Sequence, residues 1–231
     1  MLLLIFFGLL TATYLGLIIS FIYGWNKIEE FRLQGVSSKS TFSIIIPYRN
    51  EAENLPDLFK SLSSLNYPPS KFEFLLVNDA SEDDSKNLAE SFQNDFHEFN
   101  IQLIENIRKS NSPKKDAIKT AIEVSKFEYI VTTDADCIVP SKWLQYFDEA
   151  IQVSNSKMLA GPVGFTQKTG FKKPYFQNFE EMDFMSLQAS TVGSFGIEKA
   201  FMCNAANMCY EKETFIKEAG FDNDENIASG D

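Results

Sequence analysis

Two aspartates, Asp134 and Asp136, end a run of β-branched and aromatic residues that starts at Tyr129. In an extended segment, this spacing of two directs both carboxylates to the same side. Paired carboxylates form a hard, oxygen-rich site that suits Mg²⁺ or Mn²⁺. Such a cation can hold a diphosphate and stabilise it as a leaving group. The alternative interpretation is a pair of solvated turn residues, because aspartate favours turns.

The rest of the chain must build the elements that position this pair. Short apolar runs typical of strands alternate with segments whose apolar residues follow helical spacing. The expected strands cover residues 42–46, 72–77, 101–104 and 129–134, with helices starting near residues 50, 81, 113 and 141. This alternation predicts an α/β fold with a doubly wound, mostly parallel sheet. Further along, residues 158–163 fit a strand, residues 176–187 a helix and residues 190–196 a mobile loop.

Polar side chains gather where three of these strands end. Arg49, Asn50 and Glu51 follow the first strand, with Asn50 as the expected cap of the next helix. Asn78 and Asp79 follow the second strand, and the aspartate pair follows the fourth. Ligands of such sheets bind outside the carboxyl ends of the strands. Three polar strand ends therefore weigh against the turn interpretation of the aspartate pair.

Composition excludes several classes of function. The 231-residue chain carries a formal net charge of −11, which argues against a partner that is a nucleic acid. Three cysteines without metal-ligand spacing (Cys137, Cys203 and Cys209) are expected to be reduced thiols. The single histidine, His97, lies in an acidic helical stretch, which gives no support to a Ser/His/Asp or Cys/His nucleophilic system.

The chain opens with an uncharged apolar stretch, Leu2–Tyr23, that is long enough for a helix to cross a membrane. Tyr23 and Trp25 fit an interfacial aromatic belt. A cleaved signal peptide is the alternative, but the stretch has no positive n-region and no clear cleavage triplet. Lys27, Arg32 and Lys39 follow the stretch and no basic residue precedes it, which predicts a single membrane anchor with a cytoplasmic domain behind it.

Six short motifs follow one another along residues 42–231. They are residues 42–51 (FSIIIPYRNE), 77–81 (VNDAS), 112–118 (SPKKDAI), 134–136 (DAD), 203–210 (CNAANMCY) and 220–222 (GFD) with the final Gly230-Asp231. Taken together, these motifs resemble the family 2 glycosyltransferases. The resemblance implies a GT-A-like fold with a Rossmann-like nucleotide-binding half, and transfer of a sugar from a nucleotide-diphosphate sugar with inversion.

The resemblance also assigns roles to residues. The nucleotide sugar would contact Pro47, Arg49, Glu51, Asp79, Lys114 and Asp134, and the metal, Mg²⁺ or Mn²⁺, would be held by Asp134 and Asp136. Arg49 stands where relatives often carry an aromatic residue. This difference leaves open whether the nucleobase of the donor is uracil. Lys114 would meet phosphate near a helix start, with Lys115 as the alternative and a solvated lysine as the simpler interpretation.

An inverting transfer needs a base that deprotonates the acceptor hydroxyl. The resemblance places this base in an acidic motif at the end of the chain, where Asp231 is the visible candidate and the following residue is the alternative. Because the chain stops inside this motif, we expect a fragment of a longer protein.

The sequence therefore predicts a membrane anchor at residues 1–25, a juxtamembrane linker at 26–41 and a glycosyltransferase domain at 42–231. Within that domain, the nucleotide-binding half covers about 42–140 and the acceptor half about 141–231. The expected acceptor is lipid-linked or a polysaccharide, as suits a domain held at a membrane. Two alternatives remain: a non-catalytic, membrane-tethered binding protein of the same fold, and a sugar-phosphate nucleotidylyltransferase, which should carry a Gly-rich basic loop after its first strand.

Overall fold

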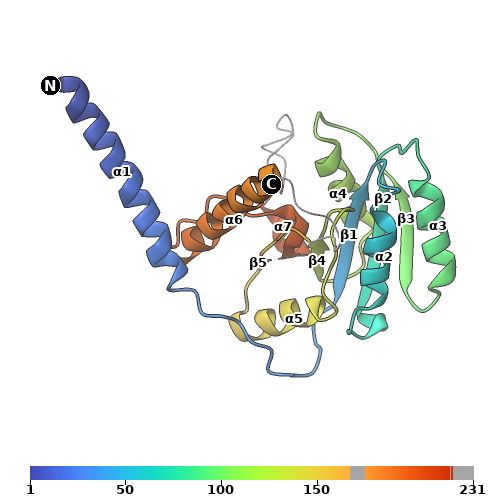
Figure 1. The fold of residues 1–231 in the computed structure, drawn as a ribbon. Coiled ribbons are helices and arrows are strands. Elements are labelled where there is room, and N and C mark those ends of the chain that lie inside the picture. The colour runs from blue at the N-terminus through green and yellow to red at the C-terminus, as the bar shows by residue number, and fades with distance from the viewer. Residues whose placement is uncertain (167–174, 219, 221–231) are drawn as a thin grey trace. The chain divides into compact units, whose positions relative to one another are not determined.

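A six-stranded sheet forms the centre of the fold in the computed structural model, which describes residues 1–166, 175–218 and 220 (Figure 1). Its strands are β1 (Phe42–Tyr48), β2 (Phe72–Asn78), β3 (Asn100–Glu105), β4 (Tyr129–Thr132), β5 (Met158–Ala160) and β6 (Met208–Glu211). They lie in the order β3-β2-β1-β4-β6-β5. The first four strands are parallel, whereas β6 runs antiparallel to both β4 and β5. The predicted α/β fold with a mostly parallel sheet is confirmed.

Helices cover both faces of this sheet. They are α2 (Leu55–Ser63), α3 (Ser85–Asp95), α4 (Pro113–Val124), α5 (Trp143–Ser154) and the short α7 (Lys212–Lys217). Two 3₁₀ turns, η1 (Pro69–Lys71) and η2 (Ala205–Asn207), complete the connections. Successive residues of a strand point to opposite faces, so Ile44 and Ile46 pack under α2, α3 and α5 whereas Ile45 packs under α4. Burial on both faces explains why the central strands read as continuous apolar runs.

Local structure differs from the sequence expectation at two helix starts. Helix α2 begins at Leu55 with Asn54 at its N-cap, so Asn50 does not cap it. Asn50 instead has a positive φ of 56°, and its side-chain oxygen accepts a hydrogen bond from Glu82 N. Helix α3 begins at Ser85, because the residues before it are engaged in this contact between loops.

The linker after the first helix is fastened to α5 by two carboxylates. Asp148, 1% exposed, accepts hydrogen bonds from Lys39 N and Ser40 N, the latter at 2.9 Å. Glu149 accepts hydrogen bonds from Gln34 N at 2.5 Å and Gly35 N at 3.0 Å. Residues 34–40 are therefore held against α5, and we call this segment the strap.

Contacts divide the chain into two compact units, residues 1–31 with 162–203, and residues 32–161 with 204–231. The first unit contains α1 (Leu2–Trp25) and α6 (Tyr175–Gly196), which pack against each other. An 18-residue window of α1 has a mean hydropathy of 2.4 and no buried residues, so this helix is long and apolar enough to cross a membrane.

Helix α6 corrects another expectation. Residues 190–196, expected to form a mobile loop, are its last two turns. The small residues that suggested a loop are needed for packing, since a Cβ at Gly193 would lie 2.4 Å from Phe21 O and one at Gly196 would lie 1.9 Å from Gly24 O. Contact with α1 therefore outweighs the low helix propensity of glycine.

Candidate functional site

Four strand ends meet at one edge of the sheet. Because β1, β2 and β3 are parallel and in register, their last residues Tyr48, Asn78 and Glu105 are aligned. Strand β4 ends at Thr132, opposite Ile45, and Thr133 N extends the ladder by a bond to Ile45 O at 3.3 Å. The residues after each of these strands are therefore brought to the same edge.

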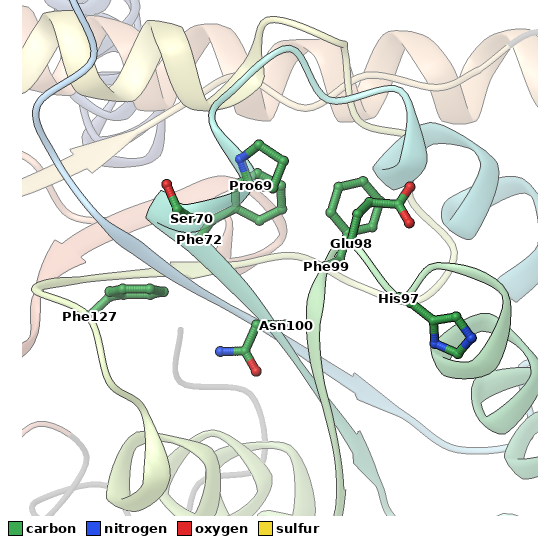
Figure 2. Close-up of a pocket in the computed structure, with 8 residues that line it drawn as sticks. All are labelled: Pro69, Ser70, Phe72, His97, Glu98, Phe99, Asn100 and Phe127. Carbon is green, nitrogen blue, oxygen red and sulfur yellow. The ribbon is translucent and has the colours of Figure 1, made fainter.

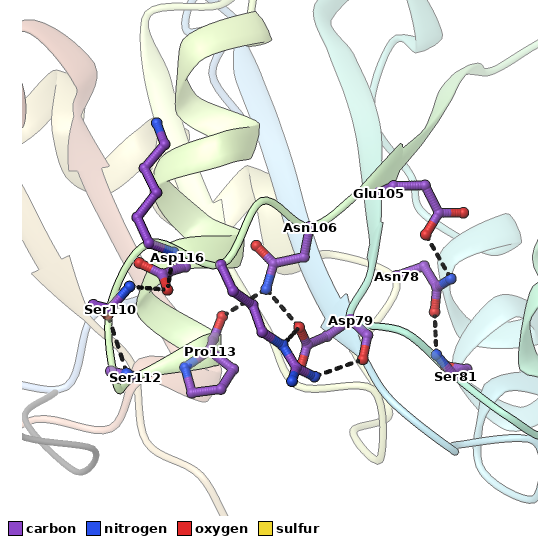
Figure 3. Close-up of polar contacts among 11 residues, drawn as sticks. Asn78, Asp79, Ser81, Glu105, Asn106, Ser110, Ser112, Pro113 and Asp116 are labelled. Atoms are coloured by element: carbon purple, nitrogen blue, oxygen red, sulfur yellow. Dashed lines mark hydrogen bonds and ion pairs between the residues drawn. The ribbon is translucent and has the colours of Figure 1, made fainter.

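Asp79 is the most strongly bound carboxylate at this edge (Figure 3). It is 7% exposed, and Arg108 binds both of its side-chain oxygens from Nε and Nη2 at 2.7 Å. Asn106 Nδ2 donates a further hydrogen bond to Oδ1 at 2.6 Å. Both partners follow β3, so the ends of β2 and β3 build one polar cluster.

These contacts keep Asp79 ionised. Burial alone would raise the pKa of the Asp79 carboxyl. The hydrogen bonds from Arg108 and Asn106, together with the positive charges of Arg108 and Arg49, outweigh burial and hold the pKa below its ordinary value. Asp79 therefore offers its remaining lone pairs as acceptors for an N–H group of a ligand.

The segment that carries Arg108 is fixed by the start of α4. Asp116 Oδ2 accepts hydrogen bonds from Lys109 N and Ser110 N, both at 2.8 Å. Asn106 Nδ2 also donates to Pro113 O at 3.0 Å, which joins the same segment to the first helical residue (Figure 3). Pro113 is well placed there, because the first helical position needs no backbone N–H.

The turn after β1 is tied to the turn after β2. Asn50 N donates to Ser81 Oγ at 3.1 Å, and Glu51 N donates to Ser85 Oγ at 2.8 Å. The Glu51 carboxylate accepts a hydrogen bond from Asn54 Nδ2 at 2.7 Å, so its partner is local. Arg49, directly before these two positions, is exposed.

The aspartate pair lies beside a lysine from α4. Lys114 Nζ forms an ion pair with Asp134 Oδ1 at 2.8 Å, and both side chains are about one-third exposed, at 39% and 35%. Asp136 is exposed, and Cys137 Sγ lies 3.8 Å from its Oδ1. Lys115, by contrast, is only 4% exposed. The ammonium of Lys114 therefore pairs with one member of the aspartate pair.

The aspartate pair suits a hard cation by the chemistry of its oxygens. Within the described residues, no group of three or more His, Cys, Asp or Glu side chains could hold a metal by itself. Two carboxylates leave most positions of an octahedral ion to other oxygens. A diphosphate could supply these oxygens, so the residues fit a cation that is bound together with a phosphate ligand.

The neighbouring antiparallel strand is joined to the same edge. Thr132 Oγ1 donates to Ala205 O at 2.6 Å, and Trp143 Nε1 donates to Asn207 Oδ1 at 2.8 Å. Asn204 caps η2 through a hydrogen bond from Ala206 N. The expected strand at 203–210 is therefore formed by η2 and β6 rather than by one continuous strand, and it is bonded to the end of β4.

The sequence expectations have different outcomes in the structure. Arg49, Asp79, Lys114 and Asp134 lie at the shared edge with Asp136, and Pro47 is partly buried on β1. The contact that the sequence missed is Asp79 with Arg108 and Asn106. Its signal was available, since both residues follow the expected third strand. Asp231 lies outside the described residues.

A pocket of about 560 Å³ lies at the opposite edge of the sheet, where β2 and β3 begin (Figure 2). Its lining includes Phe72, Asn100 and the single histidine, His97. His97 therefore lies away from the strand ends that are followed by Asp79 and Asp134, and away from Lys114 at the start of α4.

The sequence profile of glycosyl transferase family 2 matches residues 43–211. The chain belongs to this family. The match includes Asp79, Lys114, Asp134 and Asp136, and it ends at Glu211, the last residue of β6. The expected family membership is therefore confirmed.

Similar proteins agree with this assignment. The glycosyltransferase AglE of Haloferax volcanii is 32% identical over 128 residues, which are 55% of this chain and 41% of AglE. The chain thus spans less than half of that relative. A mannosyltransferase of Pyrobaculum calidifontis, solved with GDP-Man and Mn²⁺, is similar in structure with a TM-score of 0.67 at 18% sequence identity. The similarity covers 93% of this chain and 58% of the mannosyltransferase chain.

A second solved structure is more distant. Glucosyl-3-phosphoglycerate synthase from Mycobacterium tuberculosis, in complex with Mn²⁺, UDP and its product, has a TM-score of 0.53 at 12% identity. The likeness covers 80% of this chain and 64% of that one. At these identities the two structures show a shared GT-A-like fold.

Proposed function

We propose that this chain is the catalytic part of a membrane-anchored glycosyltransferase that uses a nucleotide-diphosphate sugar. The observation that carries the proposal is the meeting of Asp79, Lys114 and Asp134 with Asp136 at one sheet edge. This edge offers a hydrogen-bond acceptor for a nucleobase, an ammonium group for phosphate and two carboxylates for a metal ion. The similarity to AglE, which is named as a glycosyltransferase, supports the same reaction class.

Each donor contact follows from the chemistry of its residue. Asp79 would accept a hydrogen bond from an N–H on the base edge, which suits uracil or guanine. Arg49 would stack on the base or ribose, with Pro47 beside it and Glu51 completing the turn. Lys114 would meet the diphosphate as a point charge at the start of α4, where the helix end also favours an anion.

The proposal includes a divalent cation, Mg²⁺ or Mn²⁺, held by Asp134 and Asp136. When bound, the cation would neutralise charge on the departing diphosphate. Solved relatives that contain Mn²⁺ support this assignment. Lys114 pairs with Asp134 in this structure. A metal ion bound by Asp134 would replace this ion pair, and the ammonium of Lys114 would then be able to bind the phosphates.

Acceptor activation is assigned to Asp231. As a general base, its carboxylate would take the proton of the acceptor hydroxyl during an inverting displacement. A lipid-linked or polysaccharide acceptor suits a domain that follows a membrane anchor. The basic residues after α1, including Lys27 and Arg32, favour a cytoplasmic position for this domain.

Turnover of the donor tests this proposal. The full protein in detergent, incubated with UDP- and GDP-sugars, Mn²⁺ and membrane lipid extract, should transfer sugar and release the nucleoside diphosphate. Asp136→Asn should lower turnover about a hundredfold, since a metal contact contributes several kcal/mol to the transition state. Asp95→Asn, an exposed position at the end of α3, is the matched control and should retain activity. Equal turnover by the two variants would contradict the proposed metal site, and nucleotide binding without any turnover would favour a non-catalytic protein.

A further inference from the structure

Asn106 joins two parts of the candidate site through one side-chain amide. Its Nδ2 group donates one hydrogen bond to Asp79 Oδ1 at 2.6 Å and another to Pro113 O at 3.0 Å (Figure 3). Asp79 follows β2, whereas Pro113 is the first residue of α4 and directly precedes Lys114. Asn106 therefore connects the expected acceptor for the nucleobase to the helix that carries the lysine expected to bind phosphate.

The backbone of Asn106 is itself fixed to the sheet. Asn106 N donates to Asn78 O at 2.8 Å, which continues the pairing of β2 and β3 by one residue. The side chain is partly buried, so it does not reach its two acceptors from a loop that lies in solvent. The bridge between Asp79 and α4 is thus built on a rigid element, as a site with a fixed spacing requires.

The orientation of the Asn106 amide follows from its partners. Asp79 Oδ1 and Pro113 O are both acceptors, so the two N–H groups must face them and the amide oxygen must face away. That oxygen, Asn106 Oδ1, is buried and has no hydrogen-bond partner among the described residues. A buried acceptor without a partner lowers the stability of a folded protein. The amide therefore has a cost that an apolar side chain of similar size would avoid.

The two acceptors do not depend on Asn106 for a hydrogen bond. Asp79 Oδ1 also accepts one from Arg108 Nε at 2.7 Å. Pro113, as the first residue of α4, offers its carbonyl oxygen to the backbone N–H four residues later. Satisfying these two oxygens thus gives no reason for an asparagine at position 106. What the amide adds is a fixed spacing between them.

Other contacts in this region hold one side of the site at a time. Arg108 binds the Asp79 carboxylate through two nitrogens. Asp116 of α4 accepts hydrogen bonds from the backbone of residues 109 and 110. Each of these contacts fixes one side to the segment after β3, whereas Asn106 binds both sides with one amino group. Loss of the Asn106 amide should therefore leave each side in place and loosen the spacing between them.

We propose that Asn106 is a positioning residue that sets the spacing between Asp79 and Lys114, so that the base and the diphosphate of one donor are bound together. This role rests on the proposed function, in which Asp79 accepts the base and Lys114 binds phosphate. Two subsites at a fixed spacing bind a ligand that joins both parts more tightly than subsites whose spacing varies, because less ordering accompanies binding. Asn106 thereby raises the affinity for the whole nucleotide more than the affinity for either of its parts.

Binding of the whole ligand and of its two parts tests this proposal. The full protein in detergent is titrated with UDP and GDP in the presence of Mn²⁺, with uridine and guanosine, and with inorganic pyrophosphate and Mn²⁺. Calorimetry measures the diphosphates, and ligand-observed NMR measures the weaker nucleosides. The variants are Asn106→Leu, which keeps the size and removes both N–H groups, and Asn106→Ala, which removes them without adding bulk. Asn111→Leu, at an exposed position of the same segment, is the matched control.

Both Asn106 variants should bind the preferred nucleoside diphosphate about tenfold more weakly than the parent, and should bind its nucleoside and pyrophosphate within about twofold of the parent. Asn111→Leu should match the parent with every ligand. Unchanged binding of the diphosphate by the Asn106 variants would overturn the proposal. An equal loss for the nucleoside, or an equal loss for pyrophosphate, would overturn it in favour of a role on that side alone.

Denaturant unfolding of the same variants separates positioning from folding. Both Asn106 variants should unfold cooperatively, because Arg108 and Asp116 still hold the two sides. Loss of cooperative unfolding in both variants would overturn the proposal in favour of a structural role. A parent protein that binds neither UDP nor GDP with Mn²⁺ would contradict the proposed function and this role together. Normal binding by the parent and by both Asn106 variants would contradict the role of Asn106 alone.

Discussion

Asp79 combines burial with ionisation at the scale of a single residue. Its side chain is 10% exposed, and the guanidinium of Arg108 binds it through two parallel hydrogen bonds. Such two-point pairing fixes the plane of the carboxylate as well as its charge. A carboxylate with a fixed plane can select a ligand by the position of one N–H donor, which is what recognition of a base edge requires.

The first prediction concerns the pH dependence of stability at Asp79. Because the folded pKa is below the ordinary value, the pair stabilises the protein fully above that ordinary pKa, about 3.9. This stabilisation is lost as the pH falls through the lower, folded pKa. Wild type should therefore be more stable than Asp79→Asn at about pH 6, and the difference should shrink towards about pH 3. Denaturant unfolding at both pH values measures it, and a difference that grows on acidification would contradict the ion pair.

At the scale of an element, the strap shows how the side chains of one helix hold a segment that is distant in the chain. Apolar residues of α5 such as Trp143 and Leu144 pack in the core, but Asp148 and Glu149 accept hydrogen bonds from the backbone of residues 34–40. Gln152 Nε2 adds a hydrogen bond to Ser37 O at 3.1 Å. The segment between α1 and β1 is therefore held by side chains of a helix more than a hundred residues later in the chain.

The second prediction is that Asp148→Ala loosens the strap. The substitution leaves Lys39 N and Ser40 N without their acceptor, which should cost about 1–3 kcal/mol of unfolding free energy. Asp148→Asn keeps one acceptor oxygen and should lose less. Amide exchange at residues 39 and 40, together with the denaturation midpoint, measures the effect. Val153→Ala, at an exposed position of α5, is the control, and an equal loss in that variant would refute a specific role for Asp148.

At the scale of the whole molecule, the chain builds two units from interleaved segments. The α/β unit contains the sheet and the candidate site, and the other unit joins α1 to α6. Glycine allows a close approach in the unit of α1 and α6, because Gly24 and Gly193 bring two backbones into contact. Small residues at crossing points are typical of helices that pack in or near membranes.

The third prediction is that Gly193→Leu separates α6 from α1. The first carbon of the new side chain would lie 2.4 Å from Phe21 O, where no side chain fits. A disulfide between Phe21→Cys and Phe201→Cys, formed on oxidation in a Cys203→Ser background, reports the contact. It should form in the parent and fail in the Gly193→Leu variant. Gly16→Leu, at a position with nothing within 4 Å, should leave the disulfide intact, and its persistence in both variants would contradict the packing.

The sequence predicted the features that local patterns encode. Apolar runs at Ile44–Ile46 and Phe74–Val77 are buried on both faces, which made the parallel sheet recognisable. Arg108 was missed because its partner Asp79 is distant in the chain, although both follow strands. Residues 190–196 were read as a loop because glycine and serine oppose helix locally, and only packing against α1 reverses that preference.

Calorimetric titration of UDP and GDP into the full protein tests the central claim most directly. One of the two nucleotides should bind in the presence of Mn²⁺, and removal of Mn²⁺ should weaken binding at least about tenfold, or 1.4 kcal/mol. Asp136→Asn should bind with the lower affinity whether or not Mn²⁺ is present. No binding of either nucleotide with Mn²⁺, or the same affinity without it, would contradict a site built from Asp79, Lys114 and the aspartate pair.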